Sequence, residues 1–176
     1  QCHRQLASGL SMPIGFKNGT SGNIQIAIDA VKSSRHPHTF LGINMDNNSC
    51  IVKTKGNKNT HIILRGGRDG PNYETEHIQN LKNLIYTNNI LKPAVIIDCS
   101  HGNSMKQFQR QELVAEDVGN QKIQGEDIIK GIMLESNINE GNQSISTSLK
   151  YGVSITDACV SLEKTNEILN NLFLKL

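Results

Sequence analysis

Four short apolar segments along the chain each end in a charged side chain and are followed by a turn and a helical stretch. They span 12–17, 61–65, 94–98 and 131–135, and they end at Lys17, Arg65, Asp98 and Glu135. Continuous apolar runs are typical of parallel strands buried on both faces, and their carboxyl ends meet at one edge. The pattern therefore predicts an α/β fold, either a (β/α)8 barrel or an open doubly wound sheet. A polar residue at every strand end favours the barrel, and four such units supply about half of it.

The beginning of the chain also bears on completeness. The sequence starts at Gln1, in what reads as the end of a helix over 4–9. We therefore expect residues 1–176 to be a partial TIM-barrel domain, the C-terminal half, whose N-terminal half is absent. Two β-like runs, separated by a polar turn, predict a β-hairpin at 38–54 inserted between two barrel units.

Composition excludes several classes of protein. The formal net charge is +2, aromatic residues make up 4% and there is no Trp, so neither nucleic acid nor a charged membrane surface is an expected partner. No apolar stretch approaches the roughly 20 residues of a membrane span, and no signal peptide opens the chain. The four cysteines form no CxxC pair, which is typical of reduced thiols. We expect a cytoplasmic protein.

Helical spacing of apolar residues predicts the helices. One covers 24–31 and ends before Pro37, a second runs from about Tyr73 to Tyr86, and a third begins near Ser104 as its N-cap. The final helix is expected from about Asp157.

Lys17 and Arg65 are the candidate anion-binding residues. Each lies where a strand ends and is followed by glycines, which allow backbone N–H groups to approach a ligand. An ammonium and a guanidinium that converge suit a phosphate or a carboxylate. The alternative is that either residue pairs with a neighbouring carboxylate at the rim.

His101, Glu135 and Asp157 are the candidate metal ligands. One imidazole and two carboxylates suit Mn, Fe, Co or Zn with positions left open for a substrate oxygen. The alternatives are a hydrogen-bonding or core role for His101 and a helix-capping role for Asp157. Cys99 and Cys159 are expected to be inert buried thiols.

Five segments carry a family resemblance: 15–20, 63–67, 98–104, 135–143 and 151–159. In this order they resemble motifs of class I 3-deoxy-D-arabino-heptulosonate-7-phosphate synthases (DAHP synthases), and the resemblance covers essentially the whole chain. Met12, Cys99, the hairpin strand 40–44 and residues 150–153 look most similar to the tyrosine-sensitive members.

The resemblance implies a reaction and roles for these residues. The family condenses phosphoenolpyruvate with erythrose 4-phosphate, the first step of the shikimate pathway. Lys17 and Arg65 match residues that hold the phosphoenolpyruvate phosphate, so Lys17, Arg65 and His101 are the implied catalytic residues. His101, Glu135 and Asp157 match three of the four ligands of one divalent metal ion, which acts on the aldehyde of erythrose 4-phosphate.

Parts of the family pattern are missing. No cysteine here matches the family's fourth metal ligand, and its Lys-Pro-Arg-Thr segment, which binds erythrose 4-phosphate, is absent. We therefore assign the activity to a full-length parent, expected to be a homo-oligomer, and expect this chain alone to be inactive.

The hairpin and the segment before strand 12–17 resemble the family's feedback pocket for an aromatic amino acid. The matching residues are Leu6, Leu10, Ser11, Phe40, Gly42 and Val52. They could equally be ordinary core residues of a hairpin. Gly42 in place of a larger side chain would leave room for a bulkier effector.

Two other functions remain open. A sister synthase makes 3-deoxy-octulosonate 8-phosphate from arabinose 5-phosphate, but the Lys-Asn-Gly-Thr and Arg-Gly-Gly motifs argue against it. From another class, the chain could be an inactive, effector-binding remnant of a decayed gene.

Overall fold

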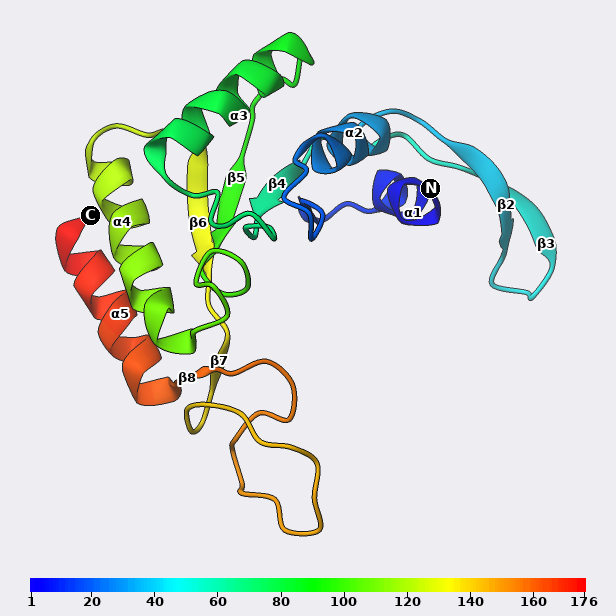
Figure 1. Cartoon of the computed structure of the whole chain (residues 1–176). Helices are drawn as coiled ribbons and strands as arrows, with labels where there is room; N and C mark the ends of the chain where they lie inside the picture. Colours follow the sequence, from blue (N-terminus) through cyan, green and yellow to red (C-terminus); the bar gives the residue numbers. More distant parts are fainter.

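A four-stranded parallel sheet forms the centre of the molecule (Figure 1). The computed structural model describes residues 1–176. The sheet has the strand order β1-β4-β5-β6, with β1 at Ile14–Lys17, β4 at Thr60–Leu64, β5 at Val95–Asp98 and β6 at Ile129–Met133. Helices connect successive strands: α2 (Gln25–Ser34) follows β1, α3 (Thr75–Thr87) follows β4 and α4 (Gln111–Ile123) follows β5. The predicted α/β fold with a parallel sheet is confirmed.

The remaining elements flank this sheet. They are α1 (Cys2–Gly9), the strands β2 (Thr39–Ile43) and β3 (Ser49–Lys53), the short parallel pair β7 (Ser136–Asn137) and β8 (Val160–Ser161), and α5 (Leu162–Lys175). None of the helices combines the length and the apolar character that a membrane span requires.

The hydrophobic core lies between one face of the sheet and the helices. Ile62 and Leu64 of β4 and Val95 and Ile97 of β5 are buried in it, together with residues of α2, α3, α4 and α5. Because side chains alternate along a strand, Ile63 and Ile96 point to the opposite face, and neither belongs to this core. The helices therefore cover one face of the sheet only.

An antiparallel hairpin of β2 and β3 extends away from the sheet (Figure 1). Phe40 pairs with Val52, and Gly42 pairs with Cys50. A Cβ on Gly42 would lie 2.6 Å from a methyl carbon of Val52, so the space above this glycine is filled by Val52. The room expected beside Gly42 for a bulkier effector is therefore not seen.

Two predicted helix starts are wrong. The third helix begins at Gln111, after a 3-10 turn at Phe108–Arg110, and Ser104 does not cap it. The Ser104 hydroxyl instead donates to the carbonyl of His101, because residues 101–107 form tight turns. The final helix begins at Leu162, and its cap is Ser161, whose hydroxyl accepts from the Lys164 N–H. Asp157 is thus free of the capping role that was its alternative.

Candidate metal and anion site

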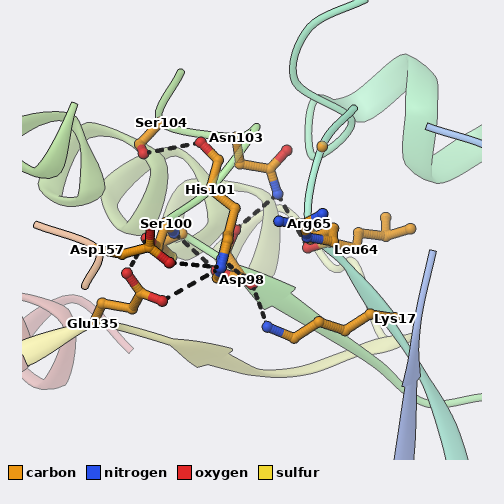
Figure 2. Close-up of polar contacts among 12 residues, drawn as sticks. Lys17, Leu64, Arg65, Asp98, Ser100, His101, Asn103, Ser104, Glu135 and Asp157 are labelled. Carbon is orange, nitrogen blue, oxygen red and sulfur yellow. Dashed lines mark hydrogen bonds and ion pairs between the residues drawn. The ribbon is translucent and has the colours of Figure 1, made fainter. Parts of the chain in front are cut away.

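The three predicted metal ligands come together at the carboxyl edge of the sheet. His101 follows β5, Glu135 follows β6, and Asp157 lies in the loop before β8. One ligand atom from each lies within 4.8 Å of the other two. Nε2 of His101 is 3.4 Å from Oε1 of Glu135 and 3.6 Å from Oδ2 of Asp157 (Figure 2).

Asp98, the last residue of β5, fixes the orientation of His101. Its carboxylate is completely buried, and Oδ2 lies 2.8 Å from Nδ1 of His101. With Nδ1 engaged, the ring presents Nε2 to the two carboxylates, an arrangement common among metal-binding histidines. His101 itself has φ +48°, a left-handed conformation that turns the chain sharply after the strand.

The surroundings of Glu135 hold it equally firmly. The Ser100 hydroxyl donates to Glu135 Oε2 at 2.9 Å. The buried amide of Gln111 accepts from the Glu135 N–H at 2.9 Å and donates to its carbonyl at 3.2 Å. Both the carboxylate and the backbone of Glu135 are therefore held in place by hydrogen bonds within the chain.

The donor set and its size fit a single divalent ion. A cavity of about 30 Å³ is lined by the three predicted ligands together with Ser100, Ser104, Lys106, Phe108 and Ala158. Two carboxylates and one imidazole are suited to first-row divalent metals, and they do not distinguish Mn, Fe, Co and Zn. A larger, more apolar cavity of about 220 Å³ lies elsewhere, between α4, α5 and β6, and holds no such donor set.

Lys17 and Arg65 flank the same edge but differ in their contacts. Lys17 Nζ forms an ion pair with Asp98 Oδ2 at 2.7 Å. The structure therefore contains the alternative arrangement, in which Lys17 pairs with a neighbouring carboxylate. The Arg65 backbone N–H donates to Asn18 Oδ1 at 2.8 Å. Arg65 is half-buried, and its guanidinium takes part in none of the ion pairs of the chain. Binding of an anion by these two residues stays a prediction.

Three buried asparagines tie the loops after β1, β4 and β5 together. Asn18 accepts from the Arg65 N–H, Asn72 accepts from the Gly66 N–H at 2.8 Å, and Asn103 accepts from the Asn72 N–H at 2.9 Å. Asn103 also donates to the carbonyl of Asp98 at 2.8 Å. Since buried backbone groups must find partners, these amides fix the strand ends relative to one another.

Glycines let the same loops touch backbone to backbone. Gly66 has φ +72°, and a Cβ there would lie 2.4 Å from the carbonyl carbon of Gly102. A Cβ on Gly67 would lie 2.5 Å from the Cα of Gly22. Real Cβ atoms do not come so close to backbone atoms, so the approach requires glycine here.

The predicted effector residues belong to α1, the segment after it and the hairpin, and none of them lines the cavity at the metal ligands. Leu6 is 59% exposed on α1, while Phe40 and Val52 are cross-strand neighbours of the hairpin. A hydrogen bond between the Ser8 and Thr54 hydroxyls, at 2.7 Å, links α1 to the end of the hairpin. An effector pocket at these residues stays a prediction.

The four cysteines are all free. Burial raises the pKa of the Cys99 thiol to about 12, with a smaller contribution from the Asp98 charge. Desolvation likewise raises the pKa of Cys159. Both thiols are therefore poor nucleophiles at neutral pH. Cys99 is buried as predicted, but the prediction of a buried Cys159 is wrong, because this residue lies half-buried in the segment before β8.

Sequence reasoning missed two residues that shape the site. The sequence predicts Asp98 only as a strand end, although the spacing Asp98-x-x-His101 places its carboxylate beside the histidine. Gln111 carries no sequence signal, because its contact with Glu135 joins segments 24 residues apart.

Comparisons with known proteins match nearly the whole chain to one family. A family model described as the DAHP synthetase I family matches residues 1–170. A tyrosine-inhibited phospho-2-dehydro-3-deoxyheptonate aldolase from Schizosaccharomyces pombe is 49% identical over 98% of this chain and 48% of its own length. The Phe-sensitive aldolase of Escherichia coli is 50% identical over 98% of this chain and 49% of its own length.

A solved structure adds the three-dimensional match. The phospho-2-dehydro-3-deoxyheptonate aldolase from Francisella tularensis superimposes with a TM-score of 0.93, at 45% identity, over 99% of this chain and 51% of that one. The chain thus spans about half the length of these relatives. On this evidence the chain belongs to the DAHP synthetase I family.

Proposed function

We propose that this chain forms part of an enzyme that condenses phosphoenolpyruvate with erythrose 4-phosphate to give 3-deoxy-D-arabino-heptulosonate 7-phosphate and phosphate. The observation that carries the proposal is the convergence of His101, Glu135 and Asp157 beside Lys17 and Arg65 at one strand edge. Membership of the family supports it. No relative named above points to the arabinose 5-phosphate reaction, and the convergence of the three predicted ligands argues against a decayed remnant.

The residues divide the chemistry between them. Lys17 and Arg65 bind the phosphate of phosphoenolpyruvate and offset the repulsion between two anionic substrates. His101, through Nε2, and the carboxylates of Glu135 and Asp157 hold a divalent metal ion. When bound, this ion supplies Lewis-acid polarisation of the erythrose 4-phosphate aldehyde.

The reaction then follows from this placement. Carbon 3 of phosphoenolpyruvate forms a bond to the aldehyde carbon, whose oxygen gains a proton. Water adds at carbon 2. The bond between carbon 2 and the phosphate oxygen then breaks, phosphate leaves, and the oxygen of the added water becomes the carbonyl oxygen. Buried Asp98 keeps the proton on Nδ1 of His101, so that Nε2 keeps its lone pair for the ion.

We further propose that the four-stranded sheet is half of a closed (β/α)8 barrel. Both outer strands, β1 and β6, have an edge without a partner strand. The face with Ile63 and Ile96 has no covering helix, and an apolar cavity lies beside β6. The match to 51% of the Francisella tularensis chain supports the same reading. The other half would complete the substrate site, and a homo-oligomer is proposed for the whole protein.

The hairpin region is proposed to bind an aromatic amino acid as a feedback effector. Relatives named as tyrosine-inhibited and Phe-sensitive match this chain at 49% and 50% identity, so identity does not select one amino acid. The residues we propose for the pocket are those given above, from α1, the segment after it and the hairpin.

Complementation by a relative's missing half tests the function. We would mix the 176-residue chain with the N-terminal half of the Schizosaccharomyces pombe relative, add Mn²⁺ and both substrates, and measure phosphate release. The matched control replaces this chain by the C-terminal half of that relative. Turnover that requires both halves and disappears in His101→Ala is expected. An active control pair beside an inactive mixed pair would reject the proposal, and turnover by this chain alone would reject the half-barrel.

A further inference from the structure

One oxygen of Asp98 contacts both the predicted anion-binding residue Lys17 and the predicted metal ligand His101. Oδ2 lies 2.7 Å from Lys17 Nζ and 2.8 Å from His101 Nδ1 (Figure 2). The other oxygen, Oδ1, accepts from the Ser100 N–H at 3.0 Å. Because Oδ1 is held by Ser100 and the carboxylate is completely buried, Lys17 and His101 share Oδ2.

We propose that Asp98 is a positioning residue that couples binding of a divalent cation at His101 to binding of an anion at Lys17. The inference rests on the proposed function, since it takes the cation and phosphoenolpyruvate as the two ligands. In this view the metal prepares the site for phosphoenolpyruvate through a shared hydrogen-bond acceptor.

The coupling follows from competition for Oδ2. When His101 binds a cation through Nε2, its ring gains positive character and its Nδ1–H becomes a stronger donor to Asp98. The interaction of Oδ2 with Lys17 weakens in return. The Lys17 side chain is 36% exposed, so its ammonium has room to turn toward an anion.

The same competition acts in reverse. An anion that draws Lys17 away leaves Oδ2 to His101 alone and makes the imidazole a better ligand. Such reciprocity is required of any coupling between two binding equilibria. Glu135 and Asp157 also face His101, but neither contacts Lys17. Among these carboxylates only Asp98 joins the two groups.

Direct attraction between the cation and the phosphate also produces coupling, so variants must separate the two causes. Asp98→Asn keeps the shape but replaces one oxygen by an N–H donor that repels Lys17. It is expected to weaken Mn²⁺ binding about tenfold and to tighten metal-free phosphoenolpyruvate binding. Lys17→Gln leaves Oδ2 to His101, and it is expected to tighten Mn²⁺ binding while it weakens phosphoenolpyruvate binding. A purely structural role of Asp98 would not move the two affinities in opposite directions.

The experiment is a titration of the 176-residue chain with Mn²⁺, with and without phosphoenolpyruvate, following free Mn²⁺ by electron paramagnetic resonance. The wild-type chain is expected to bind Mn²⁺ about tenfold tighter when phosphoenolpyruvate is present. In both variants this ratio should fall to about threefold or less, the share left to direct attraction. Asp127→Asn, at an exposed carboxylate beyond the opposite end of the sheet, is the matched control and should keep the full ratio.

Each outcome decides the matter. Full coupling in Asp98→Asn, or looser Mn²⁺ binding in Lys17→Gln, would overturn the inference. If Asp98→Asn fails to fold by circular dichroism, the Lys17→Gln result alone decides, because that side chain is partly exposed. Independent binding of both ligands to the wild-type chain rejects the coupling only. Absence of Mn²⁺ or phosphoenolpyruvate binding to the wild-type chain rejects the coupling in this chain, whereas the complementation assay decides the proposed function separately.

Discussion

The buried side-chain amide of Gln111 should stabilise the fold through its two hydrogen bonds to the backbone of Glu135. Its oxygen is the acceptor for the Glu135 N–H, and its nitrogen donates to the Glu135 carbonyl. That carbonyl also accepts from the Val160 N–H at 3.0 Å, so it keeps one partner if Gln111 is removed. The N–H has no second acceptor. The substitution Gln111→Leu, similar in size, therefore leaves one orphaned donor and one weakened acceptor.

The magnitude can be worked out from these contacts. An unsatisfied buried donor costs about 1–3 kcal/mol, and loss of a second bond to a carbonyl costs about 0.5–1.5 kcal/mol. Glu135 is only partly buried, with a side chain 24% exposed, so water can recover part of the loss. Leucine also gains some apolar burial. We expect a decrease of about 2 kcal/mol in the free energy of unfolding.

Urea unfolding followed by circular dichroism measures this change, with the slope of the transition as a check that the unfolded state is the same. The matched control is Gln25→Leu, which removes an exposed hydrogen bond to Asp29 and should cost less than about 0.5 kcal/mol. Equal stability of the two variants would refute the reasoning. Because Glu135 is a proposed ligand, Gln111→Leu should also weaken Mn²⁺ binding, whereas Gln25→Leu should not.

Two further predictions concern the site and the core. Gly66→Ala should lower the free energy of unfolding by at least about 2 kcal/mol in chemical denaturation, because it adds a Cβ at φ +72° against Gly102. The control Gly125→Ala, also at positive φ but with open space around it, should cost less. Equal costs for the two variants would contradict the steric argument. Stability should also fall as pH rises above about 9, because the Cys99 thiol ionises near its ordinary value when unfolded and only near 12 when folded, so the unfolded chain binds fewer protons. The loss is at most about 1.4 kcal/mol per pH unit. Denaturation across this range should show a shallower decline in Cys99→Ala, and an unchanged decline would rule out the thiol as its cause.

The strand ends could be predicted because their sequence signal is local. Buried runs such as 62–64 are continuous and apolar, and the first polar residue after each marks the end of the strand. The period of the helices was equally readable, so α2 and α3 lie within two residues of their expected starts. Both signals arise from burial of residues close together in sequence.

The failures share a different cause. Ser104 has the chemistry of an N-cap, but Met105 and Lys106 adopt φ values of +53° and +59°, which no helix tolerates in its first turn. Asp157 precedes a helix, yet Cys159 pairs with Gly141 and delays the start to Leu162. In each case contacts across the fold override a local preference, and one sequence alone does not display such contacts.

The contact of Asp98 with Lys17 also could not be predicted from one sequence, because it joins distant segments. Lys17 and His101 were assigned to different ligands on separate grounds, an anion and a metal. The structure joins them through one buried carboxylate 81 residues from Lys17. Only the parallel pairing of β1, β4 and β5 brings these positions to one edge.

The glycine contacts between the loops have a thermodynamic consequence. Where Gly66 meets Gly102 and Gly67 meets Gly22, no rotatable side chain separates the main chains. The spacing of the strand ends is then set by the radii of backbone atoms, and the loops behave as one body with few internal conformations. Little conformational entropy remains to be lost when ligands bind, so a larger share of the contact energy appears as affinity. On heating, the loops after β1, β4 and β5 should move together before the distance between Lys17 and the predicted metal ligands increases.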